Sequence, residues 1–109
     1  MIQLIDRREI PRLLSFCKGS PYGVRISAFL QAYGTSYPFA LFWMQTDASG
    51  RITAALSRVD GHVTLCASEQ ADWEEVWAFL SAAGYESVLC PEWAAQTAGL
   101  LSACRLESC

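Results

Sequence analysis

Apolar positions gather most clearly in the middle of the chain, in three runs separated by two turns. Residues 39–46 are rich in apolar and aromatic side chains, which is typical of a strand buried on both faces. A turn over residues 47–50 leads to a second strand over 51–59, and Asp60-Gly61 is a two-residue hairpin signal before a third strand over 62–67. The pattern predicts a three-stranded antiparallel meander.

Before the meander, the pattern predicts a short strand over residues 2–5 and a helix that begins at Asp6 and ends at Gly19. Asp6 and Glu9 have the spacing of a capping box, in which two side chains satisfy free amides at a helix start. Pro11 conflicts with a start at Asp6, because a proline past the first turn lacks an N–H that the helix needs.

A second helix is predicted between Ser20 and Gly34. Ser20 offers a hydroxyl at the cap, and Pro21 suits the first helical position. Apolar side chains recur at helical spacing, at Tyr22, Ile26, Phe29, Leu30 and Tyr33. We expect the helices on either side of the meander to cover its sheet.

After the meander, the sequence pattern predicts a helix, a strand, a second helix and a last strand. The first of these helices begins at Asp72, which has capping-box spacing to Glu75, and it ends at Gly84. The strands are expected over residues 85–90 and 105–109. The predicted order is therefore β-α-α-β-β-β-α-β-α-β.

This order predicts a mixed α/β fold, in which an antiparallel meander is followed by a β-α-β crossover. Such a crossover is expected to be right-handed and to make its two strands parallel. A chain of 109 residues with 52% hydrophobic and 17% charged residues forms one domain, residues 1–109. The sequence ends within its last predicted strand, which suggests a longer natural protein with this domain as its N-terminal part.

The net charge and an uncharged stretch of the chain bear on two classes of partner, nucleic acids and membranes. The net charge is −3, whereas nucleic acid requires a concentrated basic surface, so we expect no nucleic-acid partner. Residues 26–46 carry no charge and have about the length of a membrane span. Several polar residues and a turn interrupt this stretch, so we expect a soluble protein without a membrane partner.

The five cysteines are Cys17, Cys66, Cys90, Cys104 and Cys109. Their number is odd, they form no C-x-x-C motif, and no signal peptide precedes them. These features predict reduced thiols in a cytoplasmic protein. One histidine and scattered cysteines do not offer the closely spaced ligands of a metal site. Cys66 and Cys90 fall inside predicted strands, where we expect buried structural thiols rather than nucleophiles.

Three segments carry a resemblance to a known family. The opening MIQLIDRREIPRLLSFC is similar to the first strand and helix of the GNAT-type N-acetyltransferases, which use acetyl-CoA. The run ALFWMQTDASGRITAALSRV resembles their second and third strands. The run HVTLCASEQADWEEVWAFLSAAGYESVLC occupies the place of their cofactor-binding β-α-β unit. The resemblance covers nearly the whole chain and rests on the order of elements.

The resemblance implies a loop R/Q-x-x-G-x-G/A after the fourth strand, which binds the pyrophosphate of acetyl-CoA through backbone N–H groups and a helix N-terminus. Residues 68–75 stand here in its place, without glycine and with four carboxylates. One such charge about 4 Å from a phosphate costs roughly 4 kcal/mol at an effective dielectric near 20. The helix dipole, worth about 1 kcal/mol, does not offset this cost. We therefore expect no cofactor-binding residues.

The other catalytic parts that the resemblance implies are missing. The family's general acid is a tyrosine on the helix after the fifth strand, and residues 92–103 contain none. His62 is the one candidate for the base, but it starts a strand after a hairpin turn, where an exposed and inert histidine is expected. The remaining candidates have structural explanations. Glu74 and Glu75 are helix-start charges, and Trp73 and Trp77 are core residues. We assign no catalytic residue.

Three functions fit this sequence. The first is a non-catalytic GNAT-like domain that acts as an assembly or substrate-positioning unit, with another domain of the same protein or a second copy as its partner. The second is an N-acetyltransferase that binds acetyl-CoA in an atypical site. The third is a small stand-alone protein-interaction domain.

Overall fold

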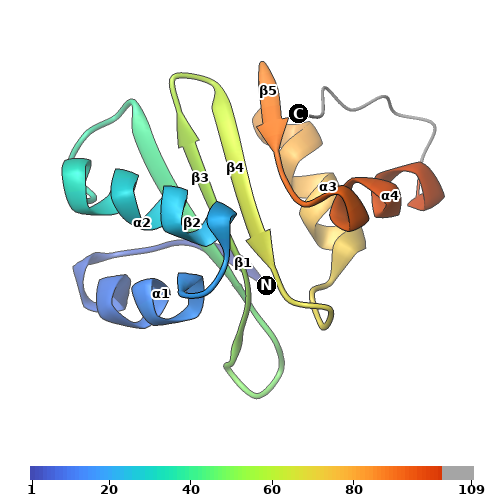
Figure 1. Ribbon diagram of the computed structural model, residues 1–109, viewed down its shortest axis with the longest axis horizontal. Helices are drawn as coiled ribbons and strands as arrows, with labels where there is room; N and C mark the ends of the chain where they lie inside the picture. The colour runs from blue at the N-terminus through green and yellow to red at the C-terminus, as the bar shows by residue number, and fades with distance from the viewer. Residues whose placement is uncertain (102–109) are drawn as a thin grey trace.

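The structure is a computed structural model that describes the backbone of residues 1–101 and the side chains of residues 1–97. Over the described residues the chain has a mixed α/β fold with one five-stranded sheet and four α-helices (Figure 1). In chain order the elements are β1 (Ile2–Leu4), a 3-10 turn (Arg7–Glu9), α1 (Ile10–Cys17), α2 (Pro21–Tyr33), β2 (Ala40–Thr46), β3 (Ile52–Val59), β4 (His62–Ala67), α3 (Trp73–Ala83), β5 (Ser87–Leu89) and α4 (Glu92–Leu101). The strand predicted over residues 105–109 lies outside the described residues.

The strands lie in the sheet in the order in which they occur in the chain, from β1 to β5. β2, β3 and β4 form the predicted antiparallel meander, and β1 adds to β2 in antiparallel fashion. β5 pairs with β4 in parallel, through the register His62↔Ser87 to Thr64↔Leu89. The predicted meander and the parallel pair that follows it are thus confirmed.

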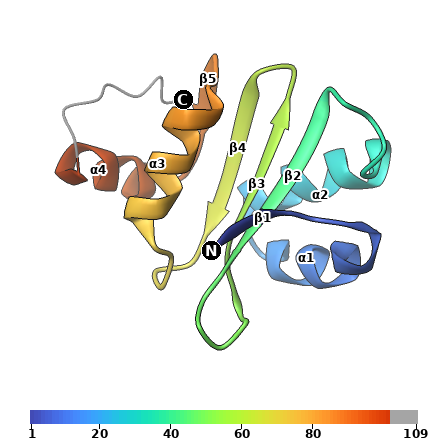
Figure 2. The ribbon, with the colours of Figure 1, turned by 180° about the vertical axis from the view of Figure 1, so that it is seen from behind.

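Helices cover both faces of the sheet, and each face has its own hydrophobic core. α1 and α2 lie on one face, and α3 and α4 lie on the other (Figures 1 and 2). In β3, the side chains of Ala54 and Leu56 belong to the core under α3, while Ala55 belongs to the core under α1 and α2. This alternation follows from the two-residue period of a strand.

The strands that are buried on both faces are β3 and β4 rather than β2. β3 is buried at five successive positions, because it lies at the centre of the sheet with helices above and below. In β2, burial alternates between complete and partial over most of the strand, because α3 covers the β1–β2 side of the sheet less fully. The expectation of a doubly buried strand over residues 39–46 is therefore wrong in this detail.

The start of α1 also differs from the prediction. Asp6 caps the short 3-10 turn, with its Oδ1 accepting a hydrogen bond from the Arg8 N–H at 2.9 Å, and the α-helix begins only at Ile10. Pro11 then falls in the first helical turn, where its missing N–H has no intrahelical partner to lose. Glu9 forms an ion pair with Arg12 instead of closing a capping box.

The uncharged stretch of residues 26–46 is divided between the end of α2, a loop and β2. Among the described residues, no helix combines the length and the apolar character needed to cross a bilayer. This agrees with the expectation drawn from the polar residues and the turn.

α2 packs on the end of α1 through a glycine. A Cβ atom at Gly23 would lie 2.1 Å from the Cys17 carbonyl oxygen, well inside van der Waals contact. Gly23 lies in the first turn of α2, after the cap residue Ser20 and Pro21, both placed as predicted. Because Gly23 has no side chain, α1 and α2 can approach each other closely at this point.

Substitution of Gly23→Ala should lower the free energy of unfolding by about 2 kcal/mol or more, because the backbone of Cys17 cannot move aside without displacing α1. Urea denaturation followed by circular dichroism measures this loss. Gln31→Ala, at an exposed position of the same helix, should change the stability by no more than about 0.5 kcal/mol. Equal midpoints for the two variants would contradict the close approach.

Candidate functional site

The loop between β4 and α3 is the place where the family resemblance puts a cofactor. Several of its backbone amides have partners within the protein. The Ser68 N–H donates to the Thr53 carbonyl at 3.0 Å, and the Ala71 N–H donates to the Ser68 carbonyl at 3.1 Å. The Asp72 carboxylate accepts a hydrogen bond from the Glu75 N–H at 3.1 Å, so it caps α3 as predicted.

Gln45, near the end of β2, joins this loop to the sheet. Its side chain is 1% exposed and makes four hydrogen bonds. The Oε1 atom accepts from the Asp72 N–H at 2.9 Å and from the Thr53 hydroxyl at 2.7 Å. The Nε2 group donates to the Asp72 carbonyl at 3.0 Å and to Glu75 Oε1 at 2.8 Å. The carboxamide thus uses its full capacity of two donors and two acceptor positions.

Thr53 reaches Gln45 because of an irregularity in the β2–β3 ladder. Gln45 pairs with Ala54 and Thr46 pairs with Ile52, so Thr53 is the extra residue of a bulge. A bulge turns a side chain out of the regular alternation. Here it brings the Thr53 hydroxyl to the buried amide.

Glu75, in the first turn of α3, links the same network to the start of the chain. Its carboxylate lies 3.1 Å from the Met1 ammonium and accepts a hydrogen bond from the Ile2 N–H at 3.1 Å. Burial opposes its ionisation, but the hydrogen bonds from Gln45, the Met1 ammonium and Ile2 outweigh burial and hold the pKa of Glu75 below its usual value. Glu75 is therefore a charged residue at the start of a helix, as predicted. Its carboxylate interacts with Met1 and Ile2 at the start of the chain and with Gln45 in β2.

The site has the wrong charge for an anionic ligand. Glu69, Asp72, Glu74 and Glu75 lie within one loop and the first turn of α3. A hollow of about 340 Å³ lies beside the loop and contains one cation, Arg51, which is paired with Asp47 at 3.5 Å. The arrangement therefore disfavours phosphate groups.

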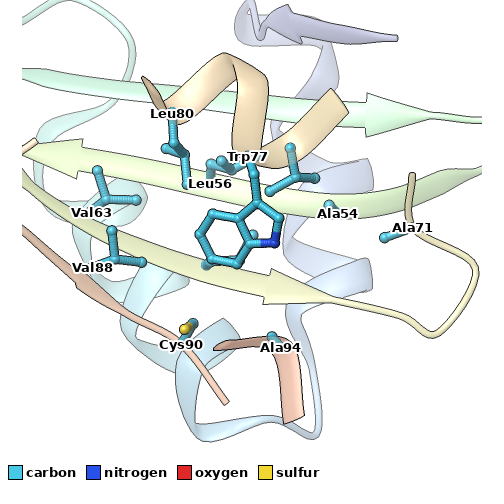
Figure 3. Close-up of a cluster of buried hydrophobic side chains, with 11 residues drawn as sticks. Ala54, Leu56, Val63, Ala71, Trp77, Leu80, Val88, Cys90 and Ala94 are labelled. Atoms are coloured by element: carbon cyan, nitrogen blue, oxygen red, sulfur yellow. The ribbon is translucent and has the colours of Figure 1, made fainter. Parts of the chain in front are cut away.

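Trp77 fills the space between the sheet and α4. Its indole lies among Val63, Val88 and Ala94 (Figure 3), and its Nε1–H donates to the Thr97 hydroxyl at 2.6 Å. Trp73 stacks on it, with ring centroids 6.3 Å apart. Trp77 is a core residue, as predicted, and Trp73 packs at the edge of the same core.

His62 lies at the opposite end of β4 from the loop, about 17 Å away at 3.3 Å per strand residue. Its Nδ1 is 2.8 Å from the Ser87 hydroxyl, and its Nε2 is 3.5 Å from a Glu86 carboxylate oxygen. The side chains of His62 and Glu86 are both exposed, so water weakens this pair. The predicted exposure of His62 is confirmed.

Cys17, Cys66 and Cys90 are all buried. Burial of Cys66 and Cys90 agrees with the prediction, although β5 ends at Leu89 and Cys90 follows it. Cys104 and Cys109 lie outside the described residues. Among the residues that the structure places, no three His, Cys, Asp or Glu side chains come together as metal ligands.

Sequence reasoning missed Gln45, the residue that organises the loop. Its partners in α3 and the preceding loop lie 27 and 30 residues away, so no local spacing links them. The available signal was one amide side chain at a position where the alternation of β2 turns it toward the core.

No protein-family model, curated protein or solved structure matches the chain.

Substitution of Gln45→Leu keeps most of the side-chain volume but leaves the Asp72 N–H and the Glu75 carboxylate without this partner. We expect a loss of about 3 kcal/mol in the free energy of unfolding. Chemical denaturation measures it, with Gln70→Leu in the exposed loop as the matched control. A loss no greater than that of the control would show that the network does not stabilise the fold.

Proposed function

We propose that this chain is a GNAT-like domain that is not catalytic by itself and acts as an assembly or substrate-positioning unit. One observation carries the proposal: several backbone amides at the place where the family binds acetyl-CoA are engaged in the protein's own hydrogen bonds. The Asp72 N–H is bonded to Gln45, and the Asp72 carboxylate holds the Glu75 N–H. These are amides that a phosphate would need at a helix N-terminus.

The order of elements supports the GNAT-like part of the proposal. The antiparallel meander leads through α3 to a parallel strand, β5, as the resemblance implies. A domain that keeps such a sheet but fills its cofactor loop retains a scaffold without the means to activate acetyl-CoA. Its proposed place is in the cytoplasm, in keeping with free thiols.

An aromatic surface cluster supports the assembly part. Tyr33, Tyr37 and Phe39 contact one another at the end of α2 and the start of β2, with ring centroids 5.1 to 6.2 Å apart. Tyr37 is 51% exposed and Phe39 is 40% exposed. Exposed aromatic side chains of this kind are enriched at protein–protein interfaces. The proposed partner is a second copy or another domain of the same protein.

Calorimetric titration of the 109-residue protein with acetyl-CoA should give no detectable binding at millimolar ligand. The acidic loop and its occupied amides are the reason for this expectation. A competent acetyltransferase titrated under the same conditions provides the positive control. Micromolar binding that Ala71→Glu abolishes would instead support the alternative, an N-acetyltransferase with an atypical acetyl-CoA site.

Sedimentation velocity should detect self-association of the wild-type protein that Tyr37→Glu weakens at least tenfold, because the substitution places a charge in an apolar contact. Val24→Glu is the matched control. Val24 is 59% exposed on the same helix that carries Tyr33, about 13 Å away along its axis. A wild-type protein that stays monomeric at high concentration would contradict assembly through a second copy.

A further inference from the structure

A serine, a histidine and a glutamate come together where the parallel strands β4 and β5 begin. His62 is the first residue of β4, and Ser87 is the first residue of β5. The Ser87 Oγ atom lies 2.8 Å from His62 Nδ1, and a Glu86 carboxylate oxygen lies 3.5 Å from His62 Nε2. The imidazole therefore lies between a hydroxyl and a carboxylate, which is the arrangement that activates a serine for attack on a carbonyl carbon.

The pairing of the two strands brings these side chains together. His62 and Ser87 are opposite each other in the β4–β5 register, so their side chains lie on the same face of the sheet. The Glu86 N–H donates to the Gly61 carbonyl at 2.8 Å, which fixes the backbone next to Ser87. A Cβ atom at Gly61 would lie 3.3 Å from the Glu86 side chain, so this side chain packs against the hairpin turn.

The two contacts of His62 suit a base that takes a proton from the serine. When the Ser87 hydroxyl donates to Nδ1, the imidazole is neutral and carries its proton on Nε2, toward Glu86. After Nδ1 has taken the hydroxyl proton, the Glu86 carboxylate stabilises the imidazolium that results. The side chains of His62 and Glu86 are 59% and 72% exposed, so water weakens this stabilisation and the expected catalysis is modest.

The sequence led us to expect an inert histidine at this position. Ser87 lies 25 residues away in the chain, so no local spacing indicates its hydrogen bond to His62. The exposure of His62 also allows a small molecule to reach the pair from water. Because the pair lies at the opposite end of β4 from the loop before α3 and needs no acetyl-CoA, its chemistry is independent of the proposed function.

We propose that Ser87 and His62 hydrolyse small carboxylic esters, with Ser87 as the nucleophile, His62 as the general base and Glu86 as a positioning residue. In the first step Ser87 Oγ bonds to the carbonyl carbon while His62 Nδ1 takes the hydroxyl proton. The bond to the leaving oxygen breaks, and the alcohol leaves with the proton that His62 returns. In the second step a water oxygen bonds to the acyl carbon and His62 takes a proton from the water. The Ser87 oxygen then leaves with that proton, and the carboxylic acid is released.

Hydrolysis of p-nitrophenyl acetate by the 109-residue protein tests the activity, with the uncatalysed rate subtracted. We expect repeated turnover, and we expect Ser87→Ala and His62→Gln each to lower the rate at least about tenfold, because both groups act in the proton transfer. Glu86→Gln should lower the rate less, by about two- to fivefold, because the pair that it forms is exposed. Ser81→Ala, at an exposed position of α3, is the matched control and should leave the rate unchanged.

A fluorophosphonate probe identifies the nucleophile without relying on turnover. It should form one adduct with the wild-type protein, with loss of fluoride, and tandem mass spectrometry should locate the adduct on Ser87. The adduct should be absent from His62→Gln that circular dichroism shows to be folded. Wild-type protein without an adduct on Ser87, or Ser87→Ala protein that hydrolyses the ester at the wild-type rate, would overturn the proposal. If a variant does not fold, the label on the wild-type protein decides alone.

Discussion

The buried carboxamide of Gln45 is the interaction on which the arrangement of the sheet and α3 depends. Its amide group donates a hydrogen bond to the Asp72 carbonyl, and its oxygen accepts one from the Asp72 N–H. The same side chain also hydrogen-bonds to Thr53 and Glu75. A buried amide costs several kcal/mol when its partners are missing. Moving α3 on the sheet would therefore remove the partners that Asp72 and Glu75 give to Gln45, so the network fixes the position of α3 as well as stabilising it.

The same network decides what the start of α3 can do. A helix N-terminus binds anions when its amides are free and its surroundings are not acidic. Here Asp72 and Glu75 supply the negative charge, and Gln45 holds the backbone. The N-terminal end of α3 is thus connected by hydrogen bonds to β1 through Ile2, to β2 through Gln45, and through Gln45 to Thr53 in β3.

Local signals in the sequence predicted most of the fold. The hairpin at Asp60-Gly61 has the positive φ angles that its residues favour, 53° and 85°, and Ser20 and Asp72 cap their helices. What could not be predicted joins residues far apart in the chain. Gln45 and its partners at the start of α3 meet only after the sheet has formed, so no local spacing in the sequence indicates their contact. Pro11 shows a third case, because its local conflict is resolved by a 3-10 turn before the helix.

Amide hydrogen exchange at Asp72, followed by NMR on the 109-residue protein, tests the central claim most directly. The account holds that this N–H is bonded to the buried Gln45 side chain and is therefore shielded from water. It predicts exchange at least about 100-fold slower than in an unstructured peptide, and a return toward the peptide rate in Gln45→Leu. Exchange of the wild-type Asp72 amide at the unstructured rate would contradict it and would leave the start of α3 free for a ligand.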